Sequence, residues 1–209
     1  KRPRIVAVTG SVGKTGAKDA IYAVLKHRVS VRKSEKSFNS ELGVPLSVLG
    51  LRNGLSNPFS WLGNLAEGLC IALFSREYPQ WLVLEAGVDR PGDMAALART
   101  LRPEIVVLTR LPEVPVHVEF FGSAEDVIRE KLHLLSALLP NGVLVYNNDD
   151  ERVREAAQSV RQKTLGFSRY SPSDFTVSAD KIIYENGRPA GMECVLTHGN
   201  DSAAVRILG

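Results

Sequence analysis

The chain has 209 residues, enough for one substantial hydrophobic core or for one core with a small appendage. Its 26 basic and 23 acidic residues give a net charge of +3, which is too small to indicate a nucleic-acid partner. No apolar stretch approaches the roughly 20 residues that a membrane-spanning helix needs, so we expect no membrane segment in this chain. Cys70 and Cys194 lie too far apart for a metal-binding spacing. Two cysteines fit a reducing compartment, and we expect a cytoplasmic monomer.

Strands and helices are predicted to alternate along the first 150 residues. After the basic stretch Lys1–Arg4, which we interpret as a solvated terminus, short apolar runs predict strands buried on both faces of a sheet. These runs are Ile5–Val8, Trp81–Leu84, Ile105–Leu108 and Val143–Tyr146. Apolar residues at helical spacing predict helices between them, over residues 17–25, 62–73, 94–101 and 124–139. This alternation is typical of a doubly wound, mostly parallel α/β sheet.

Local features refine three of these helices. Residues 52–60 are interpreted as an irregular connection before the second helix, and Cys70 on that helix is expected to be a buried thiol. Pro91-Gly92 precedes the third helix. The fourth helix is predicted to open at Ser123, with Asp126 three residues later in a near capping box.

The pattern changes after about residue 170. Four short strands are predicted, joined by glycine-containing turns, over residues 175–178, 181–184, 192–197 and 203–208. We therefore expect one domain over residues 1–209, with an α/β core over 1–170 and a small antiparallel β subregion over 171–209.

A glycine-rich loop, "VTGSVGKTG" (residues 8–16), joins the first strand to the first helix. The usual phosphate-binding loop has a further glycine five residues before Gly13, where this chain has Val8. Strand, turn and helix nevertheless form the context in which backbone N–H groups and the helix dipole bind an anion. Lys14 would contact terminal phosphates and Thr15 would bind Mg²⁺. The alternative is an ordinary tight turn with an exposed lysine.

Three further residues carry candidate chemistry. Glu85 ends a predicted strand, where it could share a metal with Thr15 or simply be a solvated acid. Lys131 falls on the apolar face of its helix, so it must be paired, modified or snorkelling, and the pattern alone favours snorkelling. His117 stands just before that helix and could be a ligand or a hydrogen-bonded structural group.

At these residues the chain resembles the central, ATP-binding domain of the Mur ligases, which build the peptide stem of the bacterial cell wall. The matching segments are "TGSVGKT", "FNSELGVPLSVL", "LEAGVDRPGDM", "HVEFFGSAEDVIREK" and "VLVYNNDD", in the order of the family and over roughly residues 5–150. The resemblance is strongest to the type that adds D-alanyl-D-alanine to a UDP-N-acetylmuramoyl tripeptide. The family's loop also lacks the earlier glycine, which accounts for Val8.

The resemblance implies a role for each matching position. The loop would bind the nucleotide phosphates through Gly10, Ser11, Val12, Gly13, Lys14 and Thr15. Two Mg²⁺ ions are implied, one held by Thr15 and Glu85 and one held with the help of His117 and Lys131, the latter matching a lysine that is carbamylated in the family. Lys14, Lys131 and His117 would be the catalytic residues.

Base, ribose and substrate contacts follow in the same way. Asn147 and Asp150 match the segment that lines the base and ribose, and Asn39 and Ser40 match the substrate-facing loop. Ser40 stands where many relatives have a second asparagine, and Arg110 stands where an asparagine is common. The link from Arg110 to His117 is also longer than usual, so these departures affect substrate contacts more than ATP binding.

The implied activity is ATP-dependent amide-bond formation in peptidoglycan precursor synthesis, through an acyl phosphate. The substrates would be a UDP-N-acetylmuramoyl peptide and an amino acid or dipeptide. Nothing here corresponds to the amino- and carboxyl-terminal domains of the ligases, so we expect the isolated chain to be inactive in ligation. Two alternatives stay open: a different P-loop phosphotransferase, such as a kinase or GTPase, and a non-catalytic Mur ligase-like module that binds ATP.

Overall fold

The computed structural model describes residues 2–35, 43–51, 54, 57–74, 78–112 and 120–208. Its strands form one nine-stranded sheet in the order β2-β3-β1-β4-β5-β6-β7-β8-β9, parallel from β2 to β7 and antiparallel from β7 to β9. The strands are β1 (Arg4–Thr9), β2 (Val31–Lys33), β3 (Trp81–Glu85), β4 (Ile105–Leu108), β5 (Val143–Asn147), β6 (Lys163–Ser168), β7 (Phe175–Glu185), β8 (Arg188–His198) and β9 (Asp201–Leu208). The predicted α/β class, mostly parallel with antiparallel strands at the carboxyl end, is confirmed.

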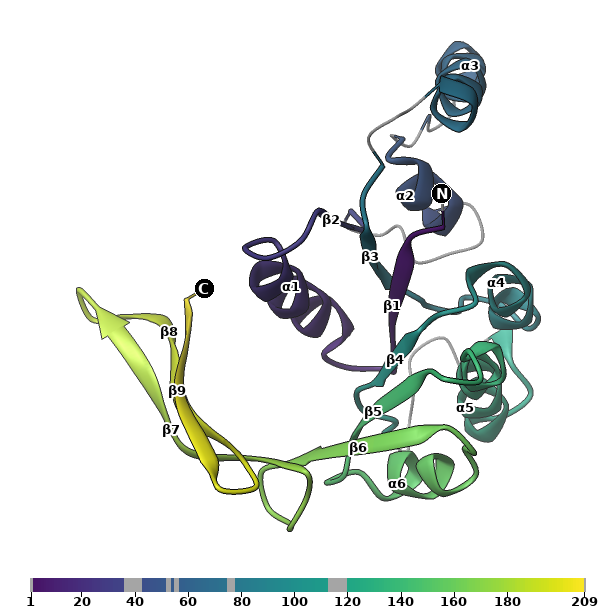
Figure 1. The fold of residues 1–209 in the computed structure, drawn as a ribbon. Helices are drawn as coiled ribbons and strands as arrows, with labels where there is room; N and C mark the ends of the chain where they lie inside the picture. Colours follow the sequence, from purple (N-terminus) through teal and green to yellow (C-terminus); the bar gives the residue numbers. More distant parts are fainter. Residues whose placement is uncertain are drawn as a thin grey trace.

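Helices cover the parallel part of the sheet on both faces (Figure 1). They are α1 (Lys14–Leu25), α2 (Gly43–Leu49), α3 (Pro58–Phe74), α4 (Asp93–Leu101), α5 (Ala124–Leu132), the 3₁₀ helix η2 (His133–Ala137) and α6 (Glu151–Gln158). Helix α1 lies on one face, while α4, α5 and α6 lie on the other. Strand β1 lies between β3 and β4, so β2 and β3 lie on one side of β1 and the later strands β4 to β6 lie on its other side. Sheets of this kind bind ligands at the carboxyl ends of the strands where the order reverses, so we expect a ligand at the carboxyl end of β1.

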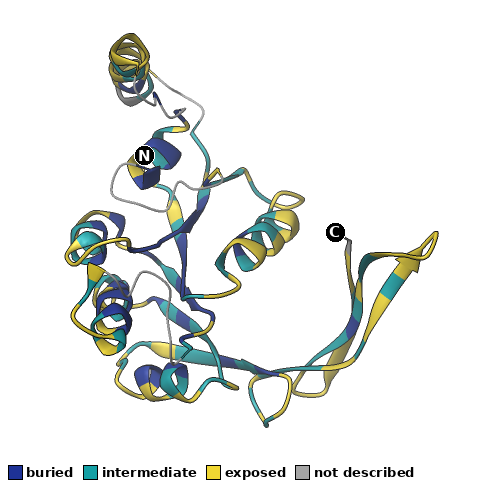
Figure 2. Ribbon diagram, turned by 180° about the vertical axis from the view of Figure 1, so that it is seen from behind, coloured by how far each residue is buried: buried dark blue, intermediate teal, exposed yellow. Residues whose placement is uncertain are grey.

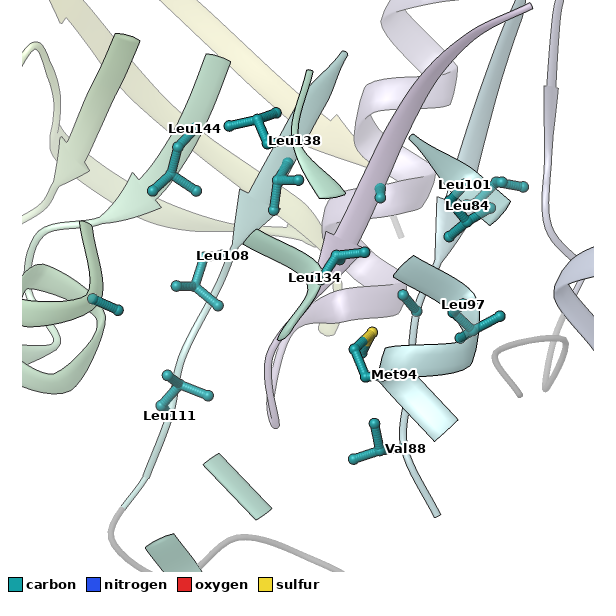
Figure 3. Close-up of a cluster of buried hydrophobic side chains, with 14 of the residues drawn as sticks. Leu84, Val88, Met94, Leu97, Leu101, Leu108, Leu111, Leu134, Leu138 and Leu144 are labelled. Carbon is teal, nitrogen blue, oxygen red and sulfur yellow. The ribbon is translucent and has the colours of Figure 1, made fainter. Parts of the chain in front are cut away.

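The larger core lies between the sheet and the helices α4 to α6 (Figure 3). Leu84 and Leu108 of the strands pack there with Met94 and Leu97 of α4 and with Leu134 of η2. A smaller cluster on the opposite face joins Val6, Val8, Val83 and Val107 to the apolar side of α1. The strands between these clusters are buried from both sides, as their uninterrupted apolar runs predict.

The antiparallel strands extend the main sheet instead of forming a separate layer. Strand β7 pairs with β6 through Phe167–Phe175 and Ser168–Thr176, and the β7–β9 ribbon then curves away from the body (Figure 1). The prediction of four strands here is wrong in one respect. Residues 175–178 and 181–184 belong to the single strand β7, because a bulge at Ala179, which has φ 51°, absorbs the irregular stretch.

Several other local predictions are corrected. Helix α3 begins at Pro58, so the end of the expected irregular connection is helical, and Cys70 on α3 is exposed instead of buried. The fourth helix ends as an α-helix at Leu132 and continues as the 3₁₀ turn η2, not as one helix to residue 139. Its predicted start is confirmed, since Ser123 caps α5 and accepts a hydrogen bond from the backbone N–H of Asp126.

The basic amino-terminal stretch is only partly a solvated terminus. Arg4 belongs to β1, lies over the ring of Trp81 at 4.0 Å and forms an ion pair with Glu104. That contact holds the pKa of the Glu104 carboxyl below its usual value. Arg2 is exposed.

Candidate nucleotide-binding site

The glycine-rich loop is held tightly against the end of β4. Gly10 has φ 137° and Gly13 has φ 86°, conformations that residues with side chains rarely adopt. A Cβ on Gly10 would lie 2.1 Å from the hydroxyl oxygen of Thr109, so only glycine fits. That hydroxyl lies 2.7 Å from the carbonyl oxygen of Val12, to which it donates, and the N–H of Ser11 donates to the carbonyl of Arg110. The loop is therefore fixed before any ligand binds.

Helix α1 begins directly at Lys14 and presents its amino end to this loop. Its cap residue, Gly13, offers no side chain to the first N–H groups, so the first turn can donate to an anion. The Lys14 ammonium lies 3.3 Å from the carbonyl oxygen of Ser11, which places its positive charge over the loop. This arrangement of backbone donors, helix dipole and lysine is what a phosphate-binding turn requires.

Glu85 at the end of β3 is not a solvated acid but the centre of a buried polar cluster. Glu85 as a whole residue is 8% exposed, and the hydroxyl of Thr15 donates to its carboxylate across 2.8 Å. Ser34 accepts a hydrogen bond from its backbone N–H. The ammonium of Lys18, itself 1% exposed, lies 3.8 Å from the same carboxylate oxygen and 3.7 Å from the carboxylate of Asp19. The first turn of α1 and the end of β3 thus place two oxygen atoms side by side, the hydroxyl of Thr15 and the carboxylate of Glu85. The ammonium of Lys18 balances the charge of that carboxylate.

Lys18 was not predicted as a site residue, although it carries the same signal as Lys131, a lysine on the apolar face of a helix. Lys18 lies three and seven residues before Ile21 and Leu25, on the apolar side of α1. A lysine at such a position needs partners, and here Asp19 and Glu85 supply them. Asp19 is shared with Lys33, whose ammonium lies 2.7 Å away, and these contacts lower the pKa of Asp19.

Lys131 of α5 reaches the same region from the opposite face of the sheet. The prediction of snorkelling is wrong, because its side chain is 2% exposed and packs into the body of the protein. The pKa of its amine is lowered to about 8, chiefly by burial and then by the positive charge of Lys14, while Asp89 acts in the opposite direction. The structure therefore brings Lys14 and Lys131 into one electrostatic environment and keeps a fraction of Lys131 neutral near pH 8.

Asn147 and Asp150 border a hollow of about 880 Å³ at the carboxyl ends of β4, β5 and β6. Both oxygens of Asp150 are engaged: one accepts from the N–H of Leu111, and the other accepts from Val153 and so caps α6. Asn147 accepts from the N–H of Asp149. The hollow is also lined by Arg110, Pro112, Arg169 and Tyr170, of which the sequence marks Arg110 alone. Asp150 thus shapes this hollow by tying α6 to the end of β4.

Three predicted site residues, Asn39, Ser40 and His117, lie outside the described residues. Within the described ranges, no group of three or more histidine, cysteine, aspartate or glutamate residues could hold a metal ion by itself. A metal at Thr15 and Glu85 would therefore need further oxygen ligands from a bound molecule or from water. None of the helices that the structure describes is both long and apolar enough to cross a membrane.

The comparisons with known proteins define the class to which this fold and loop belong. The family model described as the Mur ligase middle domain matches residues 64–209, which is more than half of the chain. The chain therefore belongs to the Mur ligase middle domain family.

Individual relatives narrow the class further. The UDP-N-acetylmuramoyl-tripeptide–D-alanyl-D-alanine ligase of Bacillus subtilis is 32% identical over 163 residues, covering 78% of this chain and 30% of that protein. The ligase of the same name from Mycobacterium leprae is 34% identical over 169 residues, covering 81% and 28%. The chain thus spans about 30% of the length of these curated relatives.

Solved structures show the same fold. MurF from Thermotoga maritima in complex with ADP superposes with a TM-score of 0.71 at 25% identity, covering 98% of this chain and 40% of that one. MurF from Acinetobacter baumannii gives a TM-score of 0.73 at 22% identity, covering 99% and 39%.

Proposed function

We propose that this chain is the ATP-binding core of a ligase that joins D-alanyl-D-alanine to a UDP-N-acetylmuramoyl tripeptide on the cytoplasmic side of the cell. The observation that carries the proposal is the hydrogen bond of Thr15 to the buried Glu85, directly beside Lys14 and the glycine-rich loop. The curated relatives named above carry this activity in their names, and one solved relative binds ADP. The remaining parts of such a ligase would supply the muramoyl peptide and the amine.

The oxygen donors of the site fit Mg²⁺. This ion prefers hard oxygen ligands and usually takes one or two protein oxygens together with phosphate and water. Thr15 and Glu85 offer two such oxygens, 2.8 Å apart. The ammonium of Lys18, 3.8 Å from the Glu85 carboxylate, helps to hold that carboxylate in place. Mg²⁺ bound there would neutralise charge on the nucleotide phosphates. Because the described residues offer so few ligands, we expect the ion to bind with the nucleotide and only weakly without it.

Lys131 is proposed to act as its carbamate. The neutral amine would add to CO₂ and release one proton, giving an anionic side chain that supports a second Mg²⁺ together with His117. Two observations support this role: the amine is buried, and its pKa of about 8 leaves a neutral fraction available for the reaction. A carbamate would also replace the repulsion between Lys131 and Lys14 by attraction.

The residues of this chain would act mainly by position and charge. In the proposed reaction a carboxylate of the muramoyl peptide attacks the γ-phosphorus of ATP, giving an acyl phosphate and ADP. The amine then attacks the acyl carbon, and phosphate leaves from the tetrahedral intermediate. Lys14 and the loop N–H groups would hold the γ-phosphoryl group and stabilise its charge, while the hollow beside Asn147 would hold the base and ribose.

Isothermal titration calorimetry with a non-hydrolysable ATP analogue and Mg²⁺ tests the proposal. We expect Lys14→Ala to weaken binding at least about a hundredfold, because a desolvated charge–phosphate contact is lost. Lys26→Ala, at the exposed far end of α1, serves as the matched control and should bind like the wild type. Equal binding by wild type and Lys14→Ala would refute the nucleotide site, and preference for GTP would favour a different P-loop enzyme.

A further inference from the structure

Helix α3 is the most unusual surface of the molecule. Its large side chains point into solvent: Phe59, Leu62, Leu65, Leu69, Leu73 and Phe74 are each between 61% and 81% exposed. Over its 17 residues the helix carries a single charge, Glu67. Monomeric proteins rarely expose so large a continuous apolar surface unless it binds something.

The inner side of α3 packs against the body of the protein, and the exposed apolar residues lie on a different side of the helix. Gly68 faces the side chains of Leu49 and Leu51, and Trp61 lies against Gly54. The exposed leucines form a stripe at spacings of three and four residues on another side of the helix. Phe59 and Cys70 widen this stripe on the neighbouring rows, so the exposed face is broad instead of a narrow seam.

The position of α3 separates this face from the nucleotide site. Helix α3 stands beyond the amino ends of β1 and β3, whereas the glycine-rich loop follows the carboxyl end of β1 (Figures 1 and 2). A partner on α3 would therefore leave the loop and the hollow beside Asn147 open.

Basic residues surround the amino ends of the strands on the same side. The described segments that border the amino ends of β1, β2 and β4 expose the basic side chains of Arg2, Arg4, Lys26, Arg28, Arg99 and Arg102. The acidic residue in these described segments is Glu104, and its carboxylate is bonded to Arg4. Among the described residues, this edge therefore carries a clear excess of positive charge.

An apolar hollow lies at the basic edge, next to α2. It has a volume of about 620 Å³ and is lined by Val44, Val48 and Leu49 of α2, with Arg2 and Arg102 also in its wall. Leu49 contacts α3 at Gly68. Apolar surface next to guanidinium groups is the combination that binds an amphiphile with an anionic head group.

We propose that α3 and this basic edge dock the protein on an anionic lipid bilayer, with α3 lying in the interface. A 17-residue helix is about 25 Å long, shorter than the roughly 30 Å hydrocarbon core, so it would lie on the membrane and not cross it. Apolar burial and attraction between the arginines and lipid phosphates would act together, as reversible membrane binding usually requires. A second copy of the chain fits less well, because pairing through α3 would bring two basic edges together.

Vesicle flotation of the 209-residue chain tests this proposal. We expect binding to vesicles of phosphatidylcholine mixed with phosphatidylglycerol, much weaker binding to pure phosphatidylcholine, and weakening by salt. Leu65→Asp/Leu69→Asp should abolish binding. The matched control is Ile182→Asp/Ile207→Asp, which changes two exposed apolar residues on β7 and β9 and should bind like the wild type. Arg99→Gln/Arg102→Gln should weaken binding about tenfold or more, and Lys181→Gln/Arg188→Gln is its control.

Cys70 gives a second measurement that needs no disruptive variant. It is the exposed cysteine on α3, while Cys194 is buried, so a thiol-reactive, environment-sensitive fluorophore will label Cys70 selectively. Anionic vesicles should shift its emission to shorter wavelength. Failure to bind either vesicle type, or unchanged binding by Leu65→Asp/Leu69→Asp, would overturn the proposal. Concentration-dependent dimerisation that the same double variant abolishes, without vesicle binding, would assign α3 to a second copy.

Discussion

Two buried lysines show how single residues define the site. Lys18 and Lys131 both stand on apolar helix faces, and both reach the glycine-rich loop or its neighbour Glu85. Their environments differ, because Lys18 lies between two carboxylates whereas Lys131 faces another lysine. Lys18 is thus compensated by two carboxylates of the chain, whereas the attraction of Asp89 does not offset burial and the charge of Lys14 at Lys131, so a ligand or a modification would relieve the remaining cost.

This difference predicts a pH-dependent stability for Lys131→Met in CO₂-free buffer. Below about pH 8 the wild-type amine is protonated in both the folded and unfolded states, so it carries the full cost of burying a charge. Between pH 8 and about 10.5 only the unfolded state holds the proton, and the free energy of unfolding of the wild type rises with pH. The variant has no charged amine to bury, so at pH 7 its free energy of unfolding should exceed that of the wild type by on the order of 3 kcal/mol.

Urea unfolding of both proteins from pH 7 to pH 10 measures the effect. The difference in the free energy of unfolding should shrink steadily toward the upper end of this range. Added bicarbonate at pH 8 should stabilise the wild type and leave Lys131→Met unchanged. A constant difference between the two proteins across the range would show that burial does not lower the pKa of Lys131.

At the scale of elements, Asp150 joins two structures that are far apart in sequence. Its carboxylate caps α6 through Val153 and holds the segment after β4 through Leu111. We expect Asp150→Ala to lower the free energy of unfolding by about 2–3 kcal/mol, since it removes two charge-assisted contacts. Ser123→Ala, which removes the cap of α5, is the comparison and should cost about 1 kcal/mol. Equal losses in urea unfolding would mean that the contact to Leu111 contributes nothing.

The elements also show which parts of the fold the sequence predicts. The strands buried on both faces, β1, β3, β4 and β5, were predicted because continuous apolar runs mark them. Two strands were missed. Strand β2 is a three-residue edge strand with two basic residues, and β6 is interrupted by Gly166, so neither has an apolar run. Helix α6 was missed as well, because most of its eight residues are polar and charged.

The candidate site was predicted only in part, for a related reason. Local motifs identify the loop, Lys14 and Thr15, because phosphate binding uses residues adjacent in sequence. The partners of Glu85 come from two separate segments, α1 and the residue after β2, and only the sheet order β2-β3-β1 brings Ser34 and Lys18 next to it. The exposure of Cys70 could not be predicted either, since an apolar helical pattern does not reveal whether its face is covered.

The whole molecule divides into a covered part and an uncovered part of one continuous sheet. Strands β1, β3 and β4 lie between helices on both faces, whereas β7, β8 and β9 curve away from the body and expose many of their side chains (Figure 2). Two residue pairs connect this ribbon to β6. Because few buried contacts hold it, the ribbon should open without unfolding the core.

Amide hydrogen exchange followed by mass spectrometry tests this division. We expect peptides from β8 and β9 to exchange at least about a hundredfold faster than peptides from β1, β3 and β4, because local opening of the ribbon requires far less free energy than global unfolding. Stacking of His198 on Phe175 and the hydrogen bond from the His198 ring to the Asp174 carbonyl anchor the base of the ribbon. His198→Ala should therefore speed exchange in the ribbon alone and leave β1 unchanged. If ribbon and core peptides exchange together in the wild type, the sheet unfolds as a single cooperative unit in spite of its uncovered end.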